Sequence, residues 1–376
     1  MKWEKVKLGN VTDSCLGKML DQNKNKGDYQ PYLANVNVRW GEFDLEDLPL
    51  MKFEESEQER YELKYGDLVI CEGGEPGRCA IWKEQIPNMK IQKALHRVRV
   101  HDCLDYRYLF YWFLLAGKTG ELDQYFTGAT IKHMPGQKLK EVVIDKPPLE
   151  IQHRIADILS AYDDLIENNQ KQIKLLEEAA QRLYKEWFVD LRFPGHENTE
   201  IMDGVPEGWS RGLLKEFISV NYGKDHKKAP DDGNIPVYGS GGLMRKCNKS
   251  LFSGEAVLIP RKGSLNNIMY VDETFWTVDT MFYATMKQPH TAVFVYFFVK
   301  AFDMYSMNIG AAVPSMTTKI LDAMDVVIPD KETLEKFDKR AKVYFNKIKT
   351  LQGQNERLKT ARDLLLPKLM NGKVEV

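Results

Sequence analysis

The chain has 376 residues, of which 43% are hydrophobic, and its 53 Lys and Arg residues against 54 Asp and Glu residues give a net charge of −1. This length accommodates two globular domains with extensions. The near-neutral charge argues against a protein that grips nucleic acid mainly through bulk positive charge.

The cysteines are odd in number, scattered, and without C-x-x-C spacing: Cys15, Cys71, Cys79, Cys103 and Cys247. Such a set is typical of reduced thiols, so we predict a cytoplasmic protein. His96, His101 and Cys103 come nearest to a zinc site, but zinc requires four closely supplied ligands, and we interpret them as ordinary strand residues. No apolar stretch reaches the ~18 residues of a membrane span.

The sequence also repeats part of itself at an offset of 182 residues. The matching pairs are Met134 and Met316, Ile166 and Ile348, Leu176 and Leu358, Ala179 and Ala361, and Leu183 and Leu365. Near the amino ends of the two copies, the pattern Trp3…Leu8…Gly17-Lys18 resembles Trp209…Leu214…Gly223-Lys224. This period is too long for a solenoid repeat, so we interpret it as one module used twice.

In chain order, residues 1–147 alternate short strand-like runs with Gly and Pro turns, around one helical stretch at 106–116. They predict a first strand-rich domain. Pro147-Pro148 ends it and opens a long helix over 148–192, because proline is tolerated in the first helical turn. The predicted apolar stripe of this helix consists of Ile151, Ile155, Ile158, Tyr162, Leu165, Asn169, Ile173, Leu176, Leu183 and Trp187.

Residues 193–208 form a polar linker, and residues 209–328 repeat the mixed strand pattern, with 294–302 as the helical counterpart of 106–116. A second long helix is predicted over 329–376. Its apolar residues alternate in steps of three and four, which is a heptad pattern: Leu334, Phe337, Ala341, Tyr344, Ile348, Leu351, Asn355, Leu358, Arg362, Leu365 and Leu369. We therefore predict an α+β fold in which two strand-rich domains are joined by two long antiparallel helices, with an internal pseudo-twofold repeat.

Each apolar stripe contains one asparagine, Asn169 or Asn355. A buried asparagine needs a polar partner, so the two side chains are candidates to meet and fix the helix register, with paired residue numbers summing to 524. The alternative is that each occupies a partly exposed position of its stripe.

Six segments in order resemble the specificity subunit of type I restriction-modification systems, and the resemblance covers the whole chain. These segments are Pro147–Gln152, Asp163–Asn169, Tyr184–Asp190, Val205–Trp209, Pro236–Gly242 and Arg362–Leu369. The resemblance implies a non-catalytic subunit in which each of two target-recognition domains reads one half of a split site in double-stranded DNA. It also implies that the helices fix the gap and bind two methyltransferase (modification) subunits, which motor-nuclease restriction subunits join. S-adenosylmethionine and ATP with Mg²⁺ are then expected in the partners, and no cofactor in this chain.

Base reading requires side chains with paired donors and acceptors, and aromatic or short polar residues position the DNA backbone. Two expected hairpin tips at matching places, Gly74–Arg78 and 261–267, each contain an arginine. The DNA-binding candidates are Arg78, Lys93, Arg97, Arg99, Lys132 and His133 in the first domain, and Tyr238, Ser240, Arg261, Lys262, Asn266 and Asn267 in the second. Thr130 and the matching Ser315, Thr317 and Thr318 are weaker candidates. The alternative is that these are solvated turns and the outer face of a half-buried strand.

Two other functions compete with DNA reading. An enzyme is disfavoured, because the chain lacks a methyltransferase motif of the Asn-Pro-Pro-aromatic kind and a G-x-x-x-x-G-K-[ST] phosphate loop. A protein-interaction rod would explain the heptads, and a silent specificity-subunit variant would explain the motifs without DNA reading. The duplicated domains with their motifs favour the DNA-reading subunit.

Overall fold

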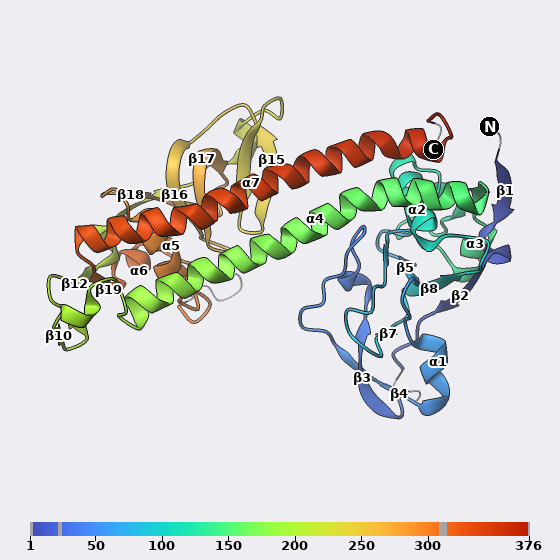
Figure 1. Ribbon diagram of the computed structural model, residues 1–376, viewed down its shortest axis with the longest axis horizontal. Coiled ribbons are helices and arrows are strands. Elements are labelled where there is room, and N and C mark those ends of the chain that lie inside the picture. Colours follow the sequence, from blue (N-terminus) through green and yellow to red (C-terminus); the bar gives the residue numbers. More distant parts are fainter. Residues whose placement is uncertain (1–2, 22–24, 308–313, 375–376) are drawn as a thin grey trace. The chain divides into compact units, whose positions relative to one another are not determined.

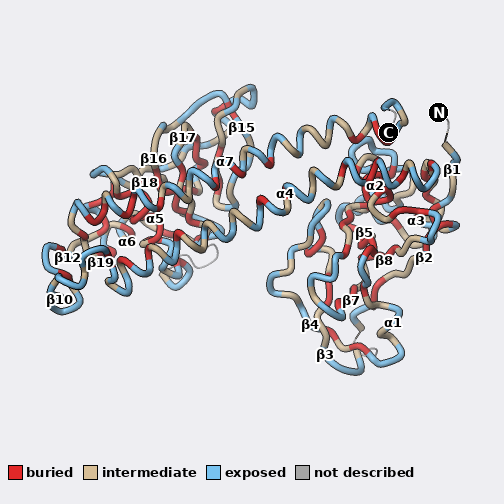
Figure 2. Tube along the Cα trace, in the orientation of Figure 1, coloured by how far each residue is buried: buried red, intermediate tan, exposed pale blue. Residues whose placement is uncertain are grey.

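The computed structural model describes residues 3–21, 25–307 and 314–374. The chain divides into two compact units, the first made of Met1–Asn168 with Gln354–Val376 and the second of Asn169–Gly353 (Figure 1). Each unit therefore contains a strand-rich region and one half of each long helix. In both units the buried residues gather in the sheets and in the helices that cover them (Figure 2).

The described residues of the first unit form three small sheets. Strands β1 (Glu4–Lys7) and β9 (Val143–Lys146) form an antiparallel pair. A four-stranded sheet has the order β2 (Thr12–Leu16), β8 (Leu95–Val100), β5 (Leu68–Cys71) and β6 (Cys79–Ile81). A three-stranded sheet has the order β4 (Leu50–Phe53), β3 (Asp28–Leu33) and β7 (Lys90–Ile91).

Helix α2 (Tyr106–Thr119) supplies much of the core of the first unit, and the shorter helices are α1 (Gln58–Tyr61) and α3 (Gly136–Glu141). Asp105 caps α2 by accepting hydrogen bonds from the backbone N–H groups of Arg107 and Tyr108. Gly120 ends it in the left-handed conformation, with φ of 75°. The predicted helical stretch at 106–116 is thus confirmed.

In the second unit, β12 (Ser210–Leu213) pairs with β19 (Asp325–Ile328), and β10 (Ile201–Met202) pairs with β11 (Val205–Pro206). A six-stranded sheet has the order β13 (Ile218–Tyr222), β18 (Met281–Met286), β16 (Phe252–Pro260), β17 (Met269–Thr277), β14 (Ile235–Gly239) and β15 (Gly242–Cys247). Helix α5 (Ala292–Lys300) packs on this sheet, and α6 (Thr318–Asp322) precedes β19.

The internal repeat is visible in equivalent backbone hydrogen bonds. The N–H of Gly17 donates to the carbonyl of Leu95 across 2.9 Å, and the N–H of Gly223 donates to that of Met281 across 2.9 Å. A Cβ atom on either glycine would lie within 2.5 Å of backbone atoms of the neighbouring chain. The repeated Gly-Lys pair therefore marks a close approach of two backbones.

The long helices are α4 (Leu149–Tyr184), which continues in a π-helical turn over Lys185–Val189, and α7 (Lys331–Met370). Within each unit their halves run antiparallel and touch. In the first unit Arg362 donates to Asp163, and in the second the ring of Trp187 lies 5.9 Å from that of Phe337. These pairs of residue numbers sum to 525 and 524, close to the predicted alignment. Asn169 and Asn355 are both 7% exposed, and their pairing stays a prediction.

The predicted stripe of α7 is confirmed, since each of its residues is buried or half-buried. The predicted stripe of α4 is wrong at two positions. Ile158 and Leu165 are 38% and 52% exposed, whereas Leu159 and Ile166 are buried. Both neighbours are apolar at each place, so the sequence pattern alone did not choose the face that packs.

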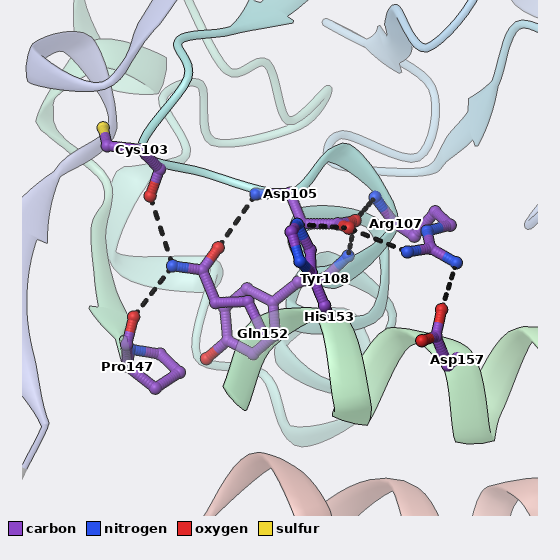
Figure 3. A network of polar contacts seen from close by, with 8 residues as sticks. All are labelled: Cys103, Asp105, Arg107, Tyr108, Pro147, Gln152, His153 and Asp157. Carbon is purple, nitrogen blue, oxygen red and sulfur yellow. Dashed lines mark hydrogen bonds and ion pairs between the residues drawn. The ribbon is translucent and has the colours of Figure 1, made fainter. Parts of the chain in front are cut away.

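The start of α4 is fastened to α2 by Gln152, which is fully buried. Its Nε2 donates to the carbonyls of Cys103 at 3.2 Å and Pro147 at 2.8 Å, and its Oε1 accepts from the N–H of Asp105 at 2.8 Å (Figure 3). Asp105 also accepts from Arg107, which reaches Asp157 on α4 across 2.6 Å. The amide of Gln152 thus joins the cap of α2 to the first turn of α4.

Among the helices that the structure describes, none combines the length and apolar character needed to cross a membrane. Residues 3–21, 25–307 and 314–374 contain no group of three or more His, Cys, Asp or Glu side chains placed to hold a metal ion. His96, considered above as a weak zinc ligand, is bonded through Nε2 to the carbonyl of Met134 at 2.9 Å. Burial lowers the pKa of this imidazole.

Candidate nucleic-acid interface

Three loops meet at one place in the first unit: 34–40 after β3, 72–78 between β5 and β6, and 127–134 before α3. Asn35 Nδ2 donates to the carbonyl of Gly73 at 2.9 Å, which joins the first loop to the second. The N–H of Met134 donates to the carbonyl of Glu72 at 2.7 Å, which joins the third loop to the second. We call these loops the first three-loop cluster.

The second unit contains the same arrangement in three segments, which we call the second three-loop cluster. They are 239–242 at the turn that joins β14 to β15, 261–268 between β16 and β17, and 314–317 before α6. The N–H of Met316 donates to the carbonyl of Arg261 at 2.9 Å. Lys262 forms a backbone bridge with Ser315, as Gly73 does with His133. The repeat therefore extends to the way in which the loops hold one another.

A glycine stands where the first and second loops touch in each cluster. Gly74 and Gly263 both have positive φ, 75° and 85°. A Cβ atom on Gly74 would lie 2.6 Å from Nδ2 of Asn35, and one on Gly263 would lie 2.8 Å from Oγ of Ser240. Both the backbone conformation and the close approach require glycine here.

The two predicted tips are equivalent, but their arginines, Arg78 and Arg261, are not at equivalent positions. The backbone carbonyls of Glu72 and Arg261 accept equivalent hydrogen bonds, so these two positions correspond. The strand register pairs Val69 with Ala80 in the first unit and Leu258 with Met269 in the second. The equivalent of Arg78 is therefore Asn267. Arg78 Nη2 donates to the carbonyl of Asn35 at 3.2 Å, and Asn267 Nδ2 donates to that of Ser240 at 2.9 Å. These two side chains fasten the loops in equivalent ways.

Other predicted residues of the second cluster also have partners within the unit. Asn266 donates to Asp303 at 3.1 Å and accepts from the N–H of Met304 at 2.8 Å. Tyr238, which precedes the cluster in β14, donates from its hydroxyl to Glu273 at 2.5 Å. These side chains hold the loop in shape.

Two basic residues of the second cluster are placed differently. The guanidinium of Arg261 is half-buried, lies 5.6 Å above the ring of Tyr222, and donates to the carbonyl of Asp279 at 3.1 Å. Lys262 is exposed. Lys262 therefore presents its charge to solvent at the loop that Arg261 begins.

The predicted outer face of β8 is corrected at Arg97. This side chain is only 9% exposed, because the segment around α1 lies over this face of β8, where Arg97 donates to the carbonyls of Glu59 at 3.1 Å and Glu62 at 3.4 Å. Arg99 forms a bidentate pair with buried Asp67 at 2.7 and 2.6 Å, and the hydrogen bond to that carboxylate raises the pKa of the guanidinium. Lys93, half-buried, precedes the strand.

The third loop of each cluster contains the remaining candidates. Lys132 is exposed, lies 5.7 Å from the ring centre of Phe126, and is 3.7 Å from the carboxylate of Asp123. His133 is exposed, and its backbone pairs with Gly73 and Thr127. Thr130 is exposed. In the second unit, Ser315, Thr317 and Thr318 are half-buried, and Thr317 caps α6 by accepting from the N–H of Ile320.

Sequence reasoning missed Asn35 and Trp40 of the first cluster, and within the tip Gly74–Arg78 it singled out Arg78 rather than Glu75. Trp40 Nε1 donates to Glu75 Oε1 at 2.7 Å. Both residues border a hollow of about 570 Å³ that Lys132 also lines. Asn35 is the equivalent of Ser240, which the sequence did suggest. The match is hidden because Leu33-Ala34-Asn35 and Tyr238-Gly239-Ser240 share no residue.

Comparison with known proteins adds to this geometry. The family of type I restriction modification DNA specificity domains matches residues 1–178 and 206–360, which is most of the chain and includes all three loops of both clusters. The chain belongs to this family. It is therefore a DNA-specificity subunit of the type I restriction-modification class, and specificity subunits of this class act with modification and restriction subunits on DNA. Subunits of this class are not catalytic, since the methyltransferase and nuclease activities belong to other subunits.

Individual relatives have low sequence identity to this chain, but the alignments cover most of both proteins. The MjaIX specificity subunit of Methanocaldococcus jannaschii is 27% identical over 352 residues, which cover 83% of this chain and 78% of the relative. The MjaVIII specificity subunit of the same organism is 24% identical, covering 100% and 93%. A crystal structure of a type I S subunit from M. genitalium aligns over 98% of this chain and 96% of that one, with a TM-score of 0.59 and 18% identity, and supports the α+β fold.

Proposed function

We propose that this specificity subunit reads a bipartite site in double-stranded DNA, each unit recognising one half through its three-loop cluster. The observation that supports this is the presence of two clusters built by equivalent backbone bonds. Gly74 and Gly263 lie where the loops touch, and Met134 and Met316 fasten the third loop. A common scaffold holds side chains in the same places, so differences among those side chains give different half-sites.

The side chains at equivalent positions of the two clusters differ, as recognition of two different half-sites requires. Position 72 of the first cluster is glutamate, and the equivalent position 261 of the second is arginine. Glu75 corresponds in the same way to Ser264. Arginine presents paired donors that suit guanine, whereas carboxylates accept from amino groups of bases. The two units are therefore proposed to recognise unlike sequences.

The rest of the assembly follows from charge and helix length. A net charge of −1 provides little phosphate neutralisation, so we propose that two methyltransferase subunits, docked on the helices, provide most of the non-specific affinity. S-adenosylmethionine is assigned to those subunits and ATP with Mg²⁺ to restriction subunits. Helices of 36 and 40 residues are about 54 and 60 Å long, and we propose that they set the gap between half-sites. The cytoplasmic location stays a prediction.

A methylome tests the proposal directly. The chain is co-expressed with its methyltransferase subunit in a host that lacks DNA methylation, and modified adenines are mapped by single-molecule sequencing. We expect one two-part motif with a fixed gap, modified once on each strand. The control is the methyltransferase subunit expressed alone, for which we expect no such motif.

The negative result is equally informative. A soluble complex of the two subunits that leaves the genome unmodified would contradict DNA reading by this chain. It would favour the interaction rod or a silent specificity subunit instead.

A further inference from the structure

We propose that Glu75 is a specificity-determining residue of the first three-loop cluster, whose carboxylate accepts a hydrogen bond from an exocyclic amino group, adenine N6 or cytosine N4. This inference rests on the proposed function and names the chemistry of one base contact. The arginine predicted from the sequence, Arg78, is assigned a positioning role behind it.

The carboxylate of Glu75 is held from two sides. Trp40 Nε1 donates to Oε1 at 2.7 Å, and Arg78 Nη1 donates to Oε2 at 3.0 Å. Arg78 is itself fixed by Asn35, whose carbonyl and Oδ1 accept from Nη2 at 3.2 and 3.3 Å. The side chain of Arg78 is 17% exposed, whereas that of Glu75 is 55% exposed. The arginine therefore faces the protein, and the carboxylate faces solvent.

The loop beneath Glu75 is closed by its own hydrogen bonds. The N–H of Gly77 donates to the carbonyl of Cys71 at 3.0 Å, and the N–H of Arg78 donates to that of Glu75 at 3.2 Å. The ring of Trp40 packs against α2 at Gly117, where an added Cβ atom would lie 2.7 Å from the Trp40 ring. A group held this firmly loses little conformational freedom when it binds, which favours its use in recognition.

The chemistry of the site selects the partner. An ionised carboxylate only accepts hydrogen bonds, and its two oxygens offer about four lone-pair positions. Trp40 and Arg78 occupy one on each oxygen, so each oxygen still has acceptor capacity. In the major groove, adenine N6 and cytosine N4 are donors, whereas guanine O6 and thymine O4 are acceptors that a carboxylate repels. Glu75 therefore favours adenine or cytosine at the base that it faces.

The surroundings reduce the repulsion between this carboxylate and DNA phosphates. Arg78 neutralises it from behind, and exposed Lys132 lines the same hollow of about 570 Å³. The equivalent residue of the second cluster is Ser264, whose hydroxyl both donates and accepts and so discriminates less. The proposed acceptor contact is therefore a property of the first unit.

The test compares the methylome of Glu75→Gln with that of the wild type, in the full complex with the methyltransferase subunit. The substitution keeps the size of the side chain and an oxygen for Trp40, but it replaces one acceptor by a donor. At one position of one half-site, the wild type is expected to accept only adenine or cytosine. In the variant we expect the discrimination against guanine and thymine at that position to fall about tenfold. The other half-site and the gap stay unchanged.

The matched control is Asp123→Asn, which removes another exposed carboxylate from the same hollow. It is expected to leave the motif unchanged. A Glu75→Gln motif identical to the wild-type motif, or a uniform loss of methylation at all sites with the motif intact, would overturn the assignment. A wild-type complex without any bipartite motif would overturn the proposed function as well, so the two failures are distinguishable.

Discussion

Asn267 donates a hydrogen bond from its side-chain Nδ2 to the backbone carbonyl of Ser240 across 2.9 Å, fastening the loop after β16 to the turn after β14. In the first unit, Arg78 makes the equivalent bond to Asn35 with a different donor. Two unlike side chains thus perform one structural task at equivalent positions. The residues that hold the loops are separate from those that the loops present, so the presented residues are free to differ.

The first prediction concerns the contact between these loops. Gly263→Ala introduces a Cβ atom 2.8 Å from Oγ of Ser240 at a φ of 85°, so we expect the full chain to lose about 1–3 kcal/mol of stability. The measurement is thermal unfolding by calorimetry. Gly241→Ala is the control, because nothing lies within 4 Å of its would-be Cβ atom. Equal melting temperatures for the two variants would contradict the prediction.

The second prediction separates the two arginines. Arg261→Ala is expected to relax or abolish recognition at one half-site, with a loss of about 1–3 kcal/mol in discrimination, because Arg261 lies in the second cluster. Arg78→Ala is expected to affect the other half-site through release of the Glu75 carboxylate. Methylomes of both variants provide the measurement. If both variants kept the wild-type methylation motif, these arginines would have no part in recognition, and other loops would have to read the DNA.

Much of this fold follows from periodicity, but the site does not. The α7 stripe and the helical stretch at 106–116 were predictable, because apolar spacing reports which face is buried. The burial of Arg97 was not, because alternation along a strand cannot reveal that the distant segment Glu59–Glu62 covers that face of β8. Glu75 was overlooked because its importance comes from Trp40, which is 35 residues away. Such relationships are set by loop closure and have no local pattern.

The third prediction concerns the attachment of α4. Gln152→Ala would leave the N–H of Asp105 and the carbonyls of Cys103 and Pro147 without their buried partner, so we expect a loss of about 2–4 kcal/mol. His153→Ala is the control, because the side chain of His153 is 50% exposed and its 3.6 Å contact with Asp105 is separate from the three hydrogen bonds that Gln152 makes. Denaturant unfolding of both variants provides the measurement. Equal midpoints would contradict the role assigned to Gln152.

The fourth prediction concerns pH. Burial alone would raise the pKa of Asp330, but hydrogen bonds from Thr333 and Trp209 outweigh it and lower the pKa below the usual 3.8. A carboxylate with a lowered folded-state pKa stabilises the fold above its unfolded pKa and loses that effect as pH falls through the folded one.

Asp330→Asn is therefore expected to melt below the wild type at pH 7, with the difference shrinking as the pH drops below about 4. Melting temperatures across pH provide the measurement, and Asp325→Asn, at an exposed strand position, is the control. A difference that stays constant down to pH 3 would contradict the assigned charge effect.

The last prediction addresses the helices as a ruler. One heptad added to each of α4 and α7 preserves the apolar period and lengthens each helix by about 10 Å. At 3.4 Å per base pair, we expect the same two half-sites separated by about three more base pairs, or loss of activity where the methyltransferase subunits no longer fit. A two-residue insertion in each helix is the control. It turns the apolar stripe by about 200° and is expected to unfold the paired helices. A heptad variant that keeps the original gap at full activity would contradict the ruler, because the half-sites would then be spaced by something other than helix length.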